Sequence, residues 1–112
     1  MENIQSISSL TQLLKTLQGS ANPVFVSLCA RCGGDNQLLD NVLQNLQESH
    51  GQKLGYQKLT GKAAQLIKDE LQISKNPVLL LISKGEIKAI FGGITAQYRL
   101  EQALEELGLK AA

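Results

Sequence analysis

Two cysteines separated by two residues are the part of this sequence with the clearest chemical potential. Cys29 and Cys32 lie in the stretch "SLCARCGGDN", from Ser27 to Asn36. This spacing is found in redox pairs and in halves of metal sites. Cysteine is also often simply buried, so two structural thiols are a third use. The residues around the motif must decide among these uses.

Metal binding needs more ligands than this chain offers. A structural zinc site wants four Cys or His ligands, whereas the chain has two cysteines and one histidine. That histidine, His50, lies in "ESHGQ", where we expect a helix to end and the side chain to reach the surface. A phosphate loop is not predicted either, because "CGGDN" lacks the lysine and the Ser/Thr of such loops. We therefore expect no metal and no bound cofactor, and the motif context favours redox chemistry.

Composition narrows the class of protein further. The 112 residues suit a single domain, 1–112, and the net charge is +1 without a basic block, which gives nucleic-acid binding no support. No apolar run is long enough to cross a bilayer, and "MENIQSISS" does not resemble a signal peptide. We expect a cytoplasmic protein with no membrane and no nucleic-acid partner. In the cytosol a structural disulfide is unusual, which leaves catalysis or redox sensing for the pair.

Hydrophobic periodicity predicts strands alternating with helices around the motif. Val24–Leu28 is β-branched and aromatic and predicts a buried strand, and a helix is expected from Asp35. The order β-α-β-α-β-α-β-β-α predicts a mixed sheet with helices on both faces. The other predicted elements are a weak strand at Ile4–Ile7, a helix opened by Ser9, a strand at Lys53–Leu59, a helix at Thr60–Leu71 capped by Thr60 with Ala63, Leu66 and Ile67 inward, a hairpin of Val78–Ile82 and Ile87–Phe91, and a last helix capped by Thr95, with Leu100, Ala103, Leu104 and Leu107 inward and Gly108 at its end.

A CxxC motif between a strand and a helix in such a pattern is typical of thioredoxin-like proteins. In this respect the sequence resembles the thioredoxin family. The more specific part of the resemblance is "NPVLLLISKGEIKAIFGGITAQYRLEQAL", from Asn76 to Leu104. It has a proline, an apolar strand, a Lys-Gly-Glu turn, a second strand, a glycine and an amphipathic helix, in the order found in that family. The resemblance implies a thioredoxin-like three-layer α/β/α sandwich whose mixed sheet has four to five strands.

The same resemblance implies roles for the cysteines and the residues between them. Cys29 would be the exposed nucleophile and Cys32 the buried resolving thiol. Ala30 and Arg31 would contact the partner, and the cation of Arg31 would favour a thiolate. The chain departs from the family by having no Trp before the first cysteine, no Gly-Pro pair inside the motif, and no acid in the preceding strand.

A substrate groove is also implied by the resemblance. Pro77 would be a cis-proline facing the cysteines, Asn76 would offer its backbone to an extended peptide, and Gly93 would let that peptide approach. The leading hypothesis is a thiol–disulfide oxidoreductase that acts on protein disulfides, uses a redox-active disulfide in place of a cofactor, and depends on an unidentified reductase. Two alternatives stay open: a binding or assembly module that uses the groove around Pro77, and a redox sensor.

Overall fold

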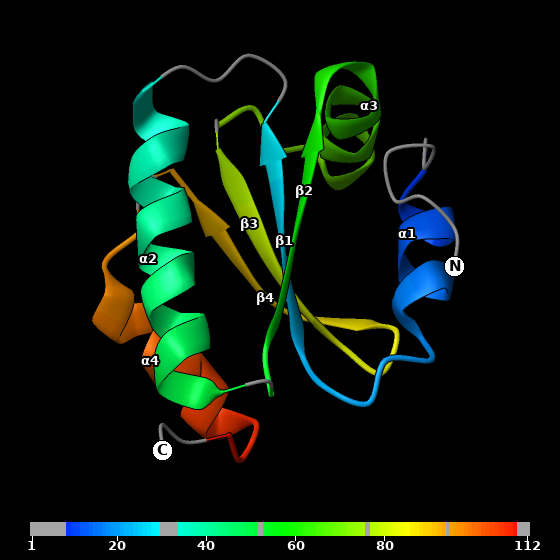
Figure 1. The fold of residues 1–112 in the computed structure, drawn as a ribbon. Coiled ribbons are helices and arrows are strands. Elements are labelled where there is room, and N and C mark those ends of the chain that lie inside the picture. Colours follow the sequence, from blue (N-terminus) through cyan, green and yellow to red (C-terminus); the bar gives the residue numbers. More distant parts are fainter. Residues whose placement is uncertain (1–8, 30–33, 52, 76, 94, 110–112) are drawn as a thin grey trace.

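The structure is a computed structural model that describes residues 9–29, 34–51, 53–75, 77–93 and 95–109, the side chains of 34–36 excepted. Helices and strands alternate in the predicted order from the first helix onward (Figure 1). The strand predicted at Ile4–Ile7 lies outside the described residues. The elements are α1 (Leu10–Leu17), β1 (Val24–Cys29), α2 (Gly34–His50), β2 (Gly55–Thr60), α3 (Gly61–Leu71), β3 (Val78–Ser83), β4 (Glu86–Gly92) and α4 (Gln97–Glu106).

The four described strands form one mixed sheet in the order β2-β1-β3-β4. Strand β1 runs parallel to β2 and antiparallel to β3, and β3 and β4 form an antiparallel hairpin. All six residues of β1 are buried, as expected for a strand with a neighbour on each side and helices above and below. The predicted antiparallel hairpin of Val78–Ile82 and Ile87–Phe91 is confirmed.

Helices cover both faces of the sheet and give the molecule three layers (Figure 1). Helices α1 and α3 pack on one face and α2 and α4 on the other. We call these the α1/α3 face and the α2/α4 face. The side chains of β1 alternate between them, as the two-residue period of a strand requires. Its buried residues on the α1/α3 face are Val24, Val26 and Leu28, and Phe25 lies on the α2/α4 face.

Local signals in the sequence account for several of the element ends. The Ser9 hydroxyl accepts a hydrogen bond from the Gln12 amide at 3.2 Å and caps α1 as predicted. Lys84 and Gly85 both have positive φ in the two-residue turn of the hairpin, the geometry that matches the twist of paired strands. Gly108 has a φ of +85° just after α4, so the predicted glycine end of that helix is confirmed.

Three details of the helices differ from the predictions. Helix α3 buries Ala64, Ile67 and Lys68, whereas Leu66 is 37% exposed, so its inward face is rotated by about one residue from the predicted one. Thr60 precedes α3 but makes no side-chain capping bond. Helix α4 begins after Ala96 and not after Thr95, whose hydroxyl donates to the Gly93 carbonyl at 3.4 Å.

The expected surface position of His50 is wrong. His50 is 3% exposed, and its Nδ1 atom lies 2.9 Å from the Leu46 carbonyl one helical turn earlier. The last turn of α2 therefore folds the imidazole back onto the helix, which satisfies one ring nitrogen away from water. The histidine is part of the packing of α2.

Candidate active site

Cys29 is the last residue of the central strand β1, and its neighbours are fixed by the strand register. It lies opposite Thr60, the last residue of β2. On the other side, Leu28 pairs with Val78, so Cys29 comes one position beyond that pair, level with Pro77. The sulfur of Cys29 takes part in a disulfide. The only other cysteine of the chain, Cys32, lies outside the described residues.

The predicted exposure of Cys29 is wrong for this disulfide-bonded state. The residue is 1% exposed, because it still belongs to a strand that is flanked on both sides and covered on both faces. By the alternation of β1, its side chain points to the α2/α4 face together with those of Phe25 and Ser27. An attacking thiolate must be reachable by its partner, and Cys29 is not reachable in this disulfide-bonded state.

Pro77 and Gly93 extend the same end of the sheet beyond Cys29. Pro77 is buried, and its carbonyl accepts a hydrogen bond from the Gly93 amide at 2.8 Å. The structure thus brings three of the predicted site residues together in the order Cys29, Pro77, Gly93 across β1, β3 and β4. Gly93 has a φ of +80°, and a β-carbon built on it would meet no atom of the described residues within 4 Å. As far as the described residues define it, the space above this glycine leaves room for a partner's backbone.

Ala30, Arg31, Cys32 and Asn76 lie outside the described residues. The cis bond before Pro77 involves Asn76 and falls there too. Their roles stay predictions.

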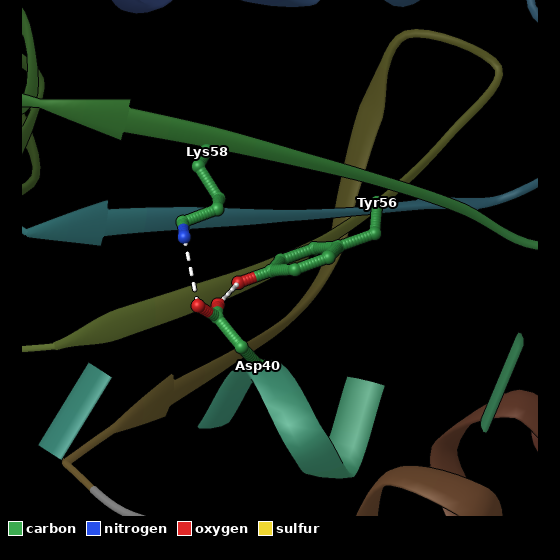
Figure 2. Close-up of polar contacts among 3 residues, drawn as sticks. All are labelled: Asp40, Tyr56 and Lys58. Carbon is green, nitrogen blue, oxygen red and sulfur yellow. Dashed lines mark hydrogen bonds and ion pairs between the residues drawn. The ribbon is translucent and has the colours of Figure 1, made fainter. Parts of the chain in front are cut away.

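A polar cluster that the sequence did not suggest lies on the α2/α4 face beside β1. The carboxylate of Asp40, from α2, accepts a hydrogen bond from the Tyr56 hydroxyl at 2.6 Å and pairs with the Lys58 ammonium at 2.8 Å (Figure 2). The Ser27 hydroxyl, which is buried, makes a further hydrogen bond to Tyr56. Because the Tyr56 proton is used on the carboxylate, Ser27 is the donor in that bond. We call Ser27, Asp40, Tyr56 and Lys58 the Asp40 cluster.

The surroundings of Tyr56 keep its hydroxyl protonated. Burial raises the pKa of Tyr56 well above its ordinary value, the Asp40 carboxylate raises it further, and the bond from Ser27 lowers it in part. The phenol is therefore a proton donor to Asp40 throughout the neutral range. The chain of bonds from Ser27 through Tyr56 to Asp40 ties the strand that carries Cys29 to the helix that follows the cysteine motif.

Only part of this cluster had a signal in the sequence. Tyr56 and Lys58 are two residues apart in a predicted strand, which places them on one face. The pairing with Asp40 spans 18 residues and depends on how α2 packs against β2, so sequence spacing gives no sign of it.

Lys75 is a further neighbour of the site, since its side chain would lie 3.0 Å from a β-carbon at Gly92.

The part of the chain that the structure describes has neither a metal-ligand cluster nor a membrane-spanning helix. No three His, Cys, Asp or Glu side chains there are grouped so that they could hold a metal ion. None of the helices described is both long enough and apolar enough to span a bilayer.

Comparisons with known proteins bear on the fold. No protein-family profile matches the chain, and no curated protein matches it. Among solved structures, the chain is similar to one from a study of the thiol resolving mechanism in yeast mitochondrial 1-Cys peroxiredoxin via glutathione/thioredoxin systems. The TM-score is 0.67 and the identity 17%, over 94% of this chain and 99% of that one. With its mixed sheet between two pairs of helices, the chain has a thioredoxin-like α/β fold.

Proposed function

We propose that this protein is a thiol–disulfide oxidoreductase that exchanges disulfides with other proteins through Cys29 and Cys32. The observation that carries the proposal is the disulfide-bonded Cys29 at the end of the central strand, level with Pro77, whose carbonyl bonds the Gly93 amide on the far side. An extended peptide can pair with backbone at such a strand end. The similar solved chain comes from work on glutathione and thioredoxin systems, which is consistent with thiol chemistry.

The proposed reaction starts from the reduced dithiol. The Cys29 thiolate attacks one sulfur of a partner disulfide, a mixed disulfide forms, and the other partner sulfur leaves as a thiolate that takes up a proton. The Cys32 thiolate then attacks the Cys29 sulfur and releases the second partner thiol. Two electrons pass to the partner, and the protein is left with a Cys29–Cys32 disulfide. A reductase or another dithiol must reduce it again, and no bound cofactor takes part.

The cytosol is the compartment that we propose. Thiols are kept reduced there, so a CxxC pair of this kind is used in turnover or sensing.

Turnover is tested by reduction of insulin with dithiothreitol as the electron source. The wild-type protein should accelerate insulin precipitation over dithiothreitol alone, whereas Cys29→Ser and Cys32→Ser should not. An acceleration that survives in either variant, or its absence in the wild type, would contradict the proposal.

The order of attack needs a second experiment, because Cys29 is buried in the disulfide state. With Cys29 as the nucleophile, Cys32→Ser should accumulate a mixed disulfide with a protein substrate and Cys29→Ser should not. Trapping only by Cys29→Ser would assign the attack to Cys32 and leave the oxidoreductase function in place.

A binding module is the second candidate, and the 1% exposure of Cys29 favours it. A sulfur that water hardly reaches suits a stable structural disulfide, with the space near Pro77 and Gly93 left to hold a partner without turnover. Inactivity with insulin, together with unchanged partner binding by Cys29→Ser, would make this the better description.

A further inference from the structure

The side chain of Lys75 is held at the cysteine end of the sheet by a neighbour that has no side chain. Gly92 is the last residue of β4 and the register partner of Val78. A β-carbon built on Gly92 would lie 3.0 Å from the Cδ atom of Lys75 and 3.7 Å from its Cβ atom. The aliphatic stem of Lys75 therefore packs over Gly92, in the room that the missing side chain leaves.

The strand register also fixes the side of the sheet on which this lysine lies. Directly opposite residues of an antiparallel pair share a face, and Val78 belongs to the α1/α3 face. The Lys75 stem thus crosses the outer edge of that face, at β4, and the residue is exposed. Within the part of the chain that the structure describes, the Lys75 ammonium has no ion pair and no hydrogen bond.

The exposed charges that the described side chains place around this end of the sheet are positive. Lys62 lies in the first turn of α3 and Arg99 in the first turn of α4, and both are exposed like Lys75. In the first two turns of α2, α3 and α4, the described acidic side chains are Asp40 and Glu101. Both already accept hydrogen bonds, Asp40 from Tyr56 and Lys58 and Glu101 from a glutamine amide. An anionic group of a partner is therefore the complement of this end.

A partner peptide that reaches Cys29 passes close to Lys75. Cys29 is level with Pro77, and the Pro77 carbonyl bonds the Gly93 amide, so two steps of about 4.8 Å between strands separate Cys29 from Gly93. An extended peptide covers this distance of about 10 Å in about three residues. Because three is odd, a peptide whose cysteine faces the α2/α4 side, to which Cys29 points, has the third residue facing the α1/α3 side, where Lys75 lies.

We propose that Lys75 selects partner disulfides in which an acidic residue lies three positions from the reacting cysteine. This inference rests on the proposed oxidoreductase function, and it names the partner as an acidic protein segment. A carboxylate at that position meets an ammonium that no described residue pairs with, so no ion pair between described residues is broken when the partner binds. Lys75 does not touch the reacting sulfurs. It acts on which partner binds and leaves the exchange of electrons to the cysteines.

The test uses three disulfide-linked peptides of equal length. The two residues three positions before and after the cysteine are Asp in the first peptide, Asn in the second and Lys in the third. The rate constant for oxidation of the reduced protein is measured with each peptide at low salt. The wild type should react fastest with the Asp peptide and slowest with the Lys peptide. Sodium chloride at about 0.5 M should reduce this preference.

Variants then assign the preference to Lys75. Lys75→Gln should lower the ratio of the Asp-peptide to the Asn-peptide rate constant by about 2- to 5-fold, the range for one exposed ion pair, and Lys75→Arg should keep the ratio. Gly92→Ala should lower it in part, because the added methyl group displaces the Lys75 stem and leaves its charge. The charges of the side chains that the structure does not describe, those of Glu2, Arg31, Asp35 and Lys110, are the same in every variant.

Lys84→Gln is the matched control. It removes an exposed lysine from the β3–β4 turn, at the opposite end of the sheet from the end of β1 (Figure 1), and should leave the ratio unchanged. An unchanged ratio in Lys75→Gln, or an equal loss in Lys84→Gln, would overturn the inference and leave the oxidoreductase function in place.

A wild type that none of the peptides oxidises would refute the function, and binding then decides the inference. The same peptides with Ser in place of Cys are titrated against the disulfide-bonded protein and followed by NMR. The wild type should bind the Asp peptide more tightly than the Asn peptide, and Lys75→Gln should reduce this ratio of affinities by about 2- to 5-fold. Equal ratios in the two proteins would refute the role of Lys75.

Discussion

The two faces of the sheet differ in the polarity of the side chains that the strands present. On the α1/α3 face, β1 and β3 present Val24, Val26, Leu28, Val78, Leu80 and Ile82 to a mainly apolar layer, to which α3 also contributes the buried Lys68. On the α2/α4 face, the same strands present Phe25, Leu79 and Leu81, but β1 also carries Ser27 and Cys29, and β2 carries Tyr56 and Lys58. The difference indicates a division of tasks. One face holds the sheet together, and the other gives up apolar contact to keep charge and hydroxyl groups near the disulfide.

The first prediction tests whether the α1/α3 face acts only through packing. Leu80 is completely buried there, so Leu80→Ala should lower the free energy of unfolding by about 2–5 kcal/mol. Denaturant titration measures this loss. Alkylation of Cys29 in the same variant should give an unchanged thiol pKa, and a clear shift would show that the two faces are not separate in their tasks.

The second prediction concerns the polar contacts of the α2/α4 face. Tyr56→Phe removes the hydroxyl that donates to Asp40 and accepts from Ser27, and leaves the buried Ser27 hydroxyl without that acceptor. The free energy of unfolding should fall by about 1–2 kcal/mol at pH 7. A variant as stable as the wild type would mean that the cluster contributes nothing to stability.

The third prediction follows from the raised pKa of Tyr56. Folding raises the pKa of Tyr56 above its value in the unfolded chain, which is near 10. Below pH 10 the contribution of Tyr56 to the free energy of unfolding is fully present. Above pH 10 this contribution is lost progressively, because the tyrosine ionises first in the unfolded chain and thereby stabilises the unfolded state. Between pH 10 and 11 the wild type should lose up to about 1.4 kcal/mol more than Tyr56→Phe. Denaturant titrations of both proteins at pH 9, 10 and 11 measure this difference. Parallel curves would contradict the buried, Asp40-bonded state of the hydroxyl.

The smallest expected effect belongs again to the α1/α3 face. Gln72 ends α3 with a φ of 58°, a left-handed conformation that suits glycine better than glutamine. Gln72→Gly should raise the free energy of unfolding by roughly 0.5–1 kcal/mol, measured by thermal or denaturant unfolding. No change should appear in the alkylation of Cys29. A destabilised variant would show that contacts of the Gln72 side chain stabilise the fold by more than the left-handed backbone conformation of Gln72 destabilises it.

Features that depend only on residues close together in the sequence were predictable. The alternation in β1 and β3, the Ser9 cap and the Gly108 end of α4 follow from short patterns. The rotation of α3 was missed because Lys68 occupies the buried face and Leu66 the outer one, the reverse of their usual preferences. The burial of Cys29 and of His50, and the contact between Asp40 and Lys58, arise only when separate elements pack together.

Strand β4 is an outer strand of the described sheet, and its exposed residues are Glu86, Lys88, Ile90 and Gly92. An outer strand that is flat and apolar can recruit a strand from another molecule and start aggregation. Ile90, 46% exposed, lies on its face between Lys88 and Gly92, a charge and a residue with no side chain to pack. Between the pairs Leu81–Ala89 and Ile82–Ile87, β4 contains one extra residue, Lys88, and this bulge adds a local bend to β4. A second copy therefore finds a poor template along β4, and the protein should stay dispersed at the concentrations that disulfide-exchange assays require.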